Sequence, residues 1–152
     1  MAKLITTQNI YYTDKKLSYH DLLSLDYYCI LIQMGVNIIY FKQEPQWMNN
    51  QYFSDAYCCY AINNKVYFDI VEVVDTHRYD KEKYIDIYNS GEIQNYNNMI
   101  YKQIGGQNNI NQFPRVILID DIQHSDEYLY INDDIKVYQL DYKMSNIISI
   151  LN

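Results

Sequence analysis

Basic residues are scarce in this chain, and their scarcity argues against nonspecific binding to nucleic acids. The 152 residues include 12 Lys and Arg against 19 Asp and Glu, which gives a formal net charge of −7. Nonspecific binding along a nucleic-acid backbone needs clustered cations that displace counterions, so we expect no appreciable affinity for random DNA or RNA. This charge balance favours another protein as the binding partner.

Glycine, proline and long apolar runs are also scarce. Four Gly and two Pro accompany 49% hydrophobic residues, a composition typical of one packed domain, which we place at 1–152. No apolar run approaches the roughly 20 residues that span a bilayer. The N-terminal segment lacks the apolar core and cleavage site of a signal peptide. We therefore expect a cytoplasmic protein, with no membrane partner, whose three cysteines are reduced.

Tyrosine, in contrast, is abundant. Nineteen tyrosines exceed ordinary usage, and together with many Asn and Ile they indicate an AT-rich genome more than a functional tyrosine surface. Buried positions account best for the three cysteines. Cys58 and Cys59 are adjacent, so in a strand they point to opposite faces and cannot hold a metal together, and Cys29 falls in the apolar stripe of a predicted helix.

The most informative segment runs from Ser54 to Asp75. Alternating aromatic and β-branched residues flank the dipeptide at 63–64, Asn-Asn, a pattern typical of two strands joined by a two-residue turn. This register places Asp55 opposite Glu72 on one face of the hairpin, with Cβ atoms roughly 5 Å apart. Like charges paired in this way are unfavourable unless a cation, a hydrogen-bond network or a shifted pKa relieves them. The pair is therefore the candidate site.

Helical and buried-strand patterns lie on both sides of this hairpin. Ser18, with Asp21 three residues later, is typical of a helix start. The remaining expected elements are strands at 36–41 and 113–120, a loop at 43–51, helices from 79 and from 93, a second hairpin formed by 128–131 and 135–140, and an amphipathic helix at 144–151. Their order predicts an α/β domain with a central mixed β-sheet flanked by helices.

Several segments resemble a known family. The helix YHDLLSLDYYCILIQ, the SDAY segment, the strand YFDIVEVVDT and the segments KEKYIDIY and FPRVILI resemble the nuclease-like C-terminal domain of the replication-relaxation family. The resemblance covers about residues 17 to 120. It implies a restriction-endonuclease-like core and an origin in a plasmid, phage or other mobile element. Members usually carry a winged helix before this domain, and the residues before Ser18 are too few for one, which argues against DNA binding.

The resemblance also implies roles for the acidic pair. The site of that fold is an Asp followed by an acid-x-Lys triplet on the next strand, and here Asp55 and Glu72 take the two acidic positions while Val74 stands where the lysine belongs. Such an enzyme needs two carboxylates for Mg²⁺ or Mn²⁺ and a cation that offsets developing charge. The sequence offers Glu44 or Asp75 as a third oxygen ligand, and the lysines that could replace the missing one are Lys42, Lys81 and Lys83.

Three hypotheses about function follow. Because position 74 is Val, we expect a noncatalytic accessory or regulatory protein of a mobile element that acts by protein–protein binding and needs no cofactor. Its candidate binding residues are His77, Arg78 and Lys81. The first alternative is a metal-dependent nuclease that uses Asp55 and Glu72. The second is a phage-type inhibitor whose acidic clusters at 120–121, 126–127 and 133–134 mimic a nucleic-acid backbone.

Overall fold

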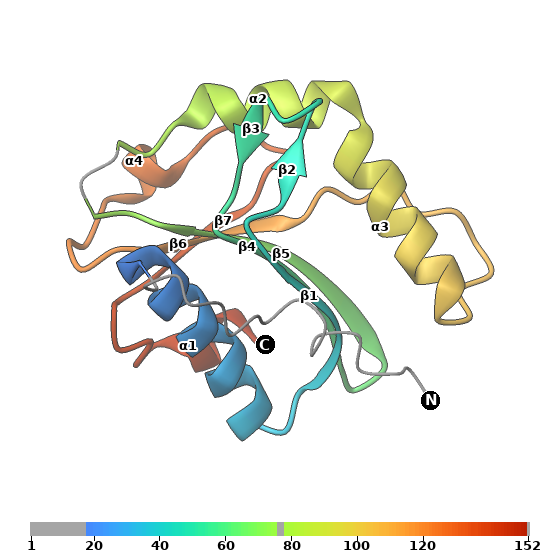
Figure 1. Ribbon diagram of the computed structural model, residues 1–152, viewed down its shortest axis with the longest axis horizontal. Helices are drawn as coiled ribbons and strands as arrows, with labels where there is room; N and C mark the ends of the chain where they lie inside the picture. The colour runs from blue at the N-terminus through green and yellow to red at the C-terminus, as the bar shows by residue number, and fades with distance from the viewer. Residues whose placement is uncertain (1–17, 76–77, 152) are drawn as a thin grey trace.

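A five-stranded mixed sheet with helices on both faces forms the core of the protein (Figure 1). The computed structural model describes residues 18–75 and 78–151. The helix α1 covers one face of the sheet, and α2 with α3 covers the other (Figure 1). The elements are α1 (Tyr19–Gln33), β1 (Asn37–Gln43), β2 (Gln46–Trp47), β3 (Tyr52–Phe53), β4 (Ala56–Ile62), β5 (Lys65–Val73), α2 (Lys81–Ser90), α3 (Glu92–Gln103), β6 (Arg115–Ile119), α4 (Asp126–Leu129), β7 (Val137–Leu140) and the 3₁₀ helix η2 (Ile147–Ile150).

The strand order is β1-β4-β5-β6-β7, with β2 and β3 forming a separate small ribbon. The first three strands of the main sheet are antiparallel neighbours. A crossover through α2 and α3 then brings β6 parallel to β5, and β7 lies parallel to β6. The predicted α/β class with a mixed sheet is therefore confirmed.

The predicted central hairpin is also confirmed. Strands β4 and β5 pair from Ile62–Lys65 down to Ala56–Val71, so the turn consists of Asn63 and Asn64. Their φ angles of 49° and 66° lie in the left-handed region, which Asn tolerates better than most residues do. This turn fixes the register that the alternating pattern of the two strands requires.

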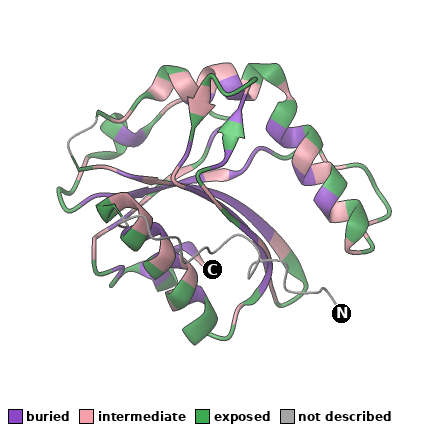
Figure 2. Ribbon diagram, viewed as in Figure 1, coloured by how far each residue is buried: buried purple, intermediate pink, exposed green. Residues whose placement is uncertain are grey.

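Burial divides the interior into two cores, one on each face of the sheet (Figure 2). On the first face, α1 begins with the predicted capping box between Ser18 and Asp21 and buries Leu23, Tyr27 and Leu31. On the second face, α2 begins at the cap Asp80, and α2 and α3 bury mainly tyrosine and isoleucine side chains: Tyr84, Ile87, Ile93 and Ile100.

A buried ionic network ties the first core to the C-terminal segment. Asp69 is fully buried, and its carboxylate accepts hydrogen bonds from the hydroxyls of Tyr27 (2.5 Å) and Tyr60 (2.7 Å). The guanidinium of Arg115 donates to the same carboxylate at 2.8 and 3.0 Å, and its third nitrogen donates to the carbonyl oxygen of Ile150 at 2.5 Å. The buried charge is thus paired and fully hydrogen-bonded, as such groups must be.

The C-terminal third differs from the predicted second hairpin. The segment expected as a strand at 128–131 begins within α4, because Ser125 caps a helical turn through the backbone N–H of Tyr128. Asn132 then accepts hydrogen bonds from the N–H groups of Asp134 and Ile135 and turns the chain. Only β7, within the expected 135–140, is a strand, and its partner is β6.

Three smaller predictions were also wrong. The expected C-terminal helix is shortened to η2, since Met144 adopts a φ of 54°, which a right-handed helix cannot contain. The expected loop at 43–51 contains β2. Cys29 lies on the exposed side of α1, whereas Cys58 and Cys59 are buried as predicted. Among the described residues, no helix has the length and apolar character that a membrane crossing requires.

Candidate functional site

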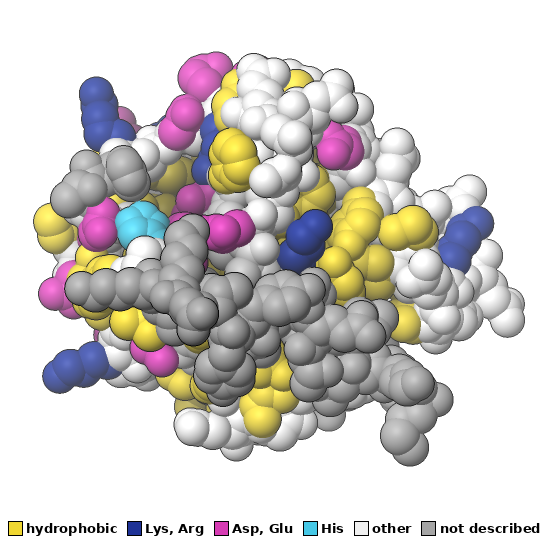
Figure 3. Space-filling model, viewed as in Figure 1, with side chains coloured by type: hydrophobic (Ala, Val, Ile, Leu, Met, Phe, Trp, Pro, Cys, Tyr) yellow, Lys and Arg dark blue, Asp and Glu magenta, His cyan; other side chains and the backbone are white. Residues whose placement is uncertain are grey.

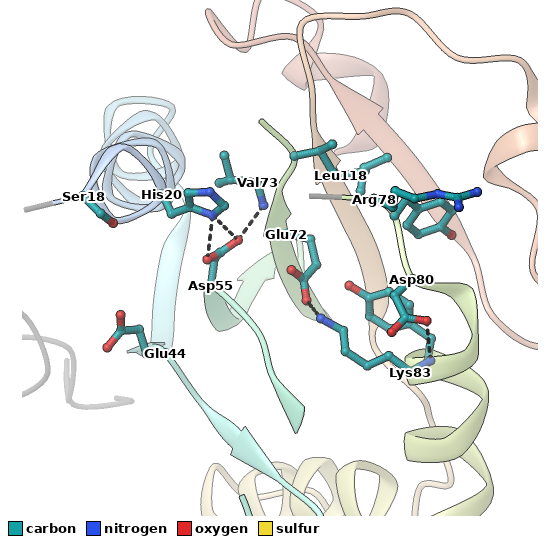
Figure 4. A pocket seen from close by; sticks show the side chains of 13 residues that line it. Ser18, His20, Glu44, Asp55, Glu72, Val73, Arg78, Asp80, Lys83 and Leu118 are labelled. Atoms are coloured by element: carbon teal, nitrogen blue, oxygen red, sulfur yellow. Dashed lines mark hydrogen bonds and ion pairs between the residues drawn. The ribbon is translucent and has the colours of Figure 1, made fainter. Parts of the chain in front are cut away.

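A cavity of about 360 Å³ lies at the end of the β4–β5 hairpin, where helices from both faces of the sheet approach it (Figure 4). Its lining comes from the start of α1, the turn after β1, the hairpin strands and the first turn of α2. The ionisable lining residues, apart from two tyrosines, are His20, Glu44, Asp55, Glu72, Arg78, Asp80 and Lys83.

Asp55 stands one step beyond the last paired residues of the hairpin, Ala56 and Val71, and so faces Glu72 in the continued register. Its N–H donates to the carbonyl of Val71 at 3.1 Å, which keeps the chain in ladder geometry. The carboxylate of Asp55 accepts the N–H of Val73 at 2.7 Å. The backbone of the opposite strand therefore fixes the side chain of Asp55 in the cavity (Figure 4).

His20, from the first turn of α1, bridges two carboxylates. Its Nδ1 lies 3.2 and 3.3 Å from the oxygens of Asp55, and its Nε2 lies 3.2 Å from Asp75. Burial lowers the pKa of His20, but Asp55 and Asp75 outweigh that effect, so the pKa stands above its ordinary value. The sequence around His20 lacks the spacing typical of metal ligands. The capping box at Ser18 is the sequence signal that places His20 in the first turn of a helix.

Glu72 is paired with a lysine from outside the hairpin. The Nζ of Lys83, in the first turn of α2, contacts Oε1 of Glu72 and donates to the carbonyl oxygen of Phe53 at 2.8 Å (Figure 4). The side chains of Lys83 and Glu72 are only 13% and 16% exposed. Burial raises the pKa of the Glu72 carboxyl, Lys83 opposes that rise, and the charge of Asp55 adds to it.

Of the other predicted site residues, some line the cavity and others do not. Arg78 lines the cavity, and so does Glu44, one of the two expected additional oxygen ligands. Lys81 lies elsewhere: its Nζ is 5.9 and 5.8 Å from the ring centroids of Tyr79 and Tyr128. His77, a predicted binding residue, lies outside the described residues.

One residue of the acidic clusters is buried and paired with a histidine. Asp120, at the end of β6, is 5% exposed, and its carboxylate lies 2.5 Å from Nε2 of His124. Its neighbour Asp121 and the other acidic clusters are exposed, at 126–127 and 133–134. The sequence pattern did not distinguish the paired acid from the exposed ones.

A divalent cation in this cavity would find few ligands among the described side chains. No three His, Cys, Asp or Glu side chains within 18–75 and 78–151 are grouped so as to hold a metal ion. Asp55 and Glu72 offer two carboxylates, so further ligands would have to be water or oxygens of a substrate. Mg²⁺ is commonly held in this way, by one or two carboxylates and substrate phosphates.

No protein-family model, no curated protein and no solved structure matches the chain. The chemistry of the cavity therefore follows from its own groups, which are two facing carboxylates at the open end of a hairpin, one beside the imidazole of His20 and one paired with Lys83.

Proposed function

We propose that the cavity is the site of a metal-dependent nuclease, with Asp55 and Glu72 as metal ligands and Lys83 as the cationic group. The position of Lys83 carries the proposal. The noncatalytic hypothesis rested on Val74, which stands where a lysine would follow Glu72 on the same strand. Lys83 reaches Glu72 from α2 instead, and this contact supports a site that combines two acidic residues with one cation.

The order of the elements supports the same proposal. A helix, an antiparallel three-stranded meander, a helical crossover and a parallel strand follow one another as α1, β1, β4, β5, α2–α3 and β6. The resemblance to the replication-relaxation family implies a restriction-endonuclease-like core, and a mixed sheet flanked by helices is compatible with such a core. Asp55 directly precedes the second strand of the meander and Glu72 lies near the end of the third, so the two acids belong to successive strands, as the resemblance implies.

Each residue of the cavity would have its own role in the proposed reaction. Asp55, fixed by the N–H of Val73, and Glu72 would hold Mg²⁺ or Mn²⁺, which when bound supplies Lewis-acid activation of a phosphate. Lys83 would offset the negative charge that develops on the phosphate oxygens as water attacks phosphorus and the bond to the leaving oxygen breaks. His20 holds Asp55 from the side of α1.

Cleavage assays with matched variants test this proposal. Wild type is compared with Asp55→Asn, Glu72→Gln and Lys83→Met on plasmid DNA and on single- and double-stranded oligonucleotides of DNA and RNA, with Mg²⁺ or Mn²⁺. We expect each variant to lose a factor of about 100 to 1000 in rate. Lys81→Met is the control, because Lys81 lies in the same helical turn but outside the cavity. Equal background cleavage by all five proteins would refute the nuclease.

One observation favours a second candidate, the noncatalytic protein–protein role. His20 and Lys83 already pair with both carboxylates, so the like-charge repulsion of Asp55 and Glu72 is relieved without a metal. The net charge of −7 and the exposed acidic clusters suit a basic protein partner. This role predicts no cleavage by any of the proteins and co-purification of the same partner with wild type and with Asp55→Asn.

A further inference from the structure

One buried polar group of the cavity lacks a hydrogen-bond partner. Tyr84, in the first turn of α2, lines the cavity together with Glu72 and Lys83 and is 1% exposed. Among the described residues, no acceptor lies in hydrogen-bonding geometry to its hydroxyl. The one other buried side-chain atom in this state within the described chain is Oε1 of Gln94, which lies outside the cavity. Buried polar groups are hydrogen-bonded in most proteins, so this exception needs a physical reason.

The carboxylate of Glu72 is the acidic neighbour of this hydroxyl. Burial, followed by the charge of Glu72, raises the pKa of Tyr84 well above its ordinary value. The hydroxyl therefore stays protonated, and a protonated hydroxyl is available as a donor to a carboxylate. Tyr84 thus places a donor beside Glu72 without a hydrogen bond between them.

Lys83 is the residue that holds Glu72 instead. Its Nζ contacts Oε1 of Glu72 and donates to the carbonyl oxygen of Phe53 at 2.8 Å. The same Nζ lies 5.1 Å from the ring centroid of Tyr84. Two consecutive residues of α2 therefore meet at one carboxylate, Lys83 as its ionic partner and Tyr84 as an unused donor. A carboxylate has two oxygens and accepts several hydrogen bonds, so Glu72 can exchange one partner for the other.

The proposed reaction draws Lys83 away from Glu72. An ammonium group that turns toward a substrate phosphate leaves Glu72, whose side chain is only 16% exposed, without its ionic partner. A buried carboxylate needs a hydrogen-bond donor, and carboxylates that hold a metal are themselves hydrogen-bonded. Figure 3 shows acidic side chains gathered around a histidine where Figure 1 places the start of α1. The carboxylates that line the cavity are those of Glu44, Asp55, Glu72 and Asp80.

We propose that Tyr84 is a positioning residue of the site: its hydroxyl donates to the carboxylate of Glu72 when Lys83 leaves Glu72 to act on a substrate phosphate. Glu72 then keeps its orientation in the cavity while Lys83 offsets the charge on the phosphate oxygens. The loss of such an orienting hydrogen bond typically costs about 10–100-fold in metal affinity or activity. The inference rests on the proposed nuclease for the role of Lys83, but the exchange of partners at Glu72 can be measured without metal or substrate.

Urea unfolding of the full chain, without divalent cations, tests this exchange in a double-mutant cycle. Tyr84→Phe removes only the hydroxyl, and Lys83→Met removes the competing partner of Glu72. In the wild-type background, Tyr84→Phe should change the equilibrium constant of unfolding less than about twofold, because the hydroxyl has no partner there. In the Lys83→Met background, the same substitution should raise this constant about tenfold, because the hydroxyl then donates to the charged carboxylate of Glu72.

Tyr79→Phe is the matched control for the cycle. Tyr79 also lines the cavity, but its hydroxyl donates to the carbonyl oxygen of Leu129 at 2.9 Å. Tyr79→Phe should therefore have the same effect on unfolding in both backgrounds. If Lys83→Met does not fold, Lys83→Gln, which keeps a polar end, takes its place, and the same coupling to Tyr84→Phe is expected.

The outcomes separate this inference from the nuclease proposal. Equal effects of Tyr84→Phe in the two backgrounds would refute the exchange, whether or not the wild type cleaves nucleic acid. With a cleaving wild type, Tyr84→Phe should lower kcat about tenfold and leave KM within about twofold, because the hydroxyl contacts Glu72 and not the substrate. An unchanged kcat would refute the positioning role. Absence of cleavage by the wild type would refute the nuclease alone, since the unfolding cycle needs no substrate.

Discussion

Replacing Arg115 with methionine provides a quantitative test of the buried network around Asp69. Asp69 is fully buried, and the guanidinium of Arg115 is the cation that donates to its carboxylate, at 2.8 and 3.0 Å. The Arg115→Met variant keeps most of the apolar volume of the side chain and removes the charge. The hydroxyls of Tyr27 and Tyr60 remain, so the carboxylate keeps two hydrogen bonds but loses its counter-ion.

The expected loss in free energy of unfolding follows from these contacts. Removing one partner of a buried ion pair typically costs about 3–5 kcal/mol. The bond from Arg115 to the carbonyl of Ile150, which holds η2 against the sheet, contributes about 1 kcal/mol more. The total free energy of unfolding of a domain is about 5–15 kcal/mol, so such a loss would leave the protein only marginally stable.

Urea unfolding followed by circular dichroism measures the effect, and Lys65→Met is the matched control. Lys65 and Arg115 both lie 4.8 Å from the ring centroid of Tyr67, but Lys65 is exposed. Lys65→Met should cost less than about 1 kcal/mol. The double variant Asp69→Asn/Arg115→Met should lose about 2 kcal/mol less free energy of unfolding than the sum of the losses in the two single variants, because no buried charge remains. Equal stability of Arg115→Met and Lys65→Met would refute the argument.

Three further predictions concern other parts of the chain. A thiol reagent should modify Cys29 rapidly in the native protein and the other two cysteines only after unfolding in urea. The reason is that burial raises the pKa of Cys58 well above its ordinary value and that of Cys59 to about 12. Rapid reaction of all three cysteines would contradict this prediction. Asn64→Val should lower the free energy of unfolding, measured by thermal unfolding, by about 1–2 kcal/mol, because the backbone φ of Asn64 is 66°. Asn64→Gly should leave the free energy of unfolding unchanged, because glycine adopts this φ without strain. In the absence of a divalent cation, fluorescence anisotropy should show no binding of a random labelled duplex near physiological salt, given the charge of −7, and micromolar affinity under these conditions would reveal a basic surface patch.

Local patterns were sufficient to predict the hairpin and the facing carboxylates. The turn at Asn63 and Asn64 and the alternation of the two strands determine a register, and that register alone places Asp55 opposite Glu72. The capping box at Ser18 likewise marks the start of α1. These features depend on residues close together in the sequence, where spacing is informative.

The cations of the site could not be assigned in the same way. His20 and Asp55 are 35 positions apart, and their contact depends on how α1 packs against the sheet. Lys83 was one of three candidate lysines, and Lys81 was as plausible from its spacing. The two lysines lie about 200° apart around a helix axis, so the exact rotation of α2 decides which of them meets Glu72. That rotation follows from the packing of Tyr84 and Ile87 on the sheet.

The energetics of the acidic pair support the proposed site at Asp55 and Glu72. Glu72 is mostly buried, and its pKa remains raised by that burial even with Lys83 beside it, so the carboxylate is costly to the fold. Neutral residues at 55 and 72 would pair across the hairpin without that cost. Instead, helices on opposite faces of the sheet each contribute one basic side chain to the same cavity, His20 from α1 and Lys83 from α2. Ionisable side chains that are unfavourable in their local environment, and that are stabilised by residues from distant elements, are characteristic of functional sites. This is the physical argument for the proposal that Asp55 and Glu72 form the functional site.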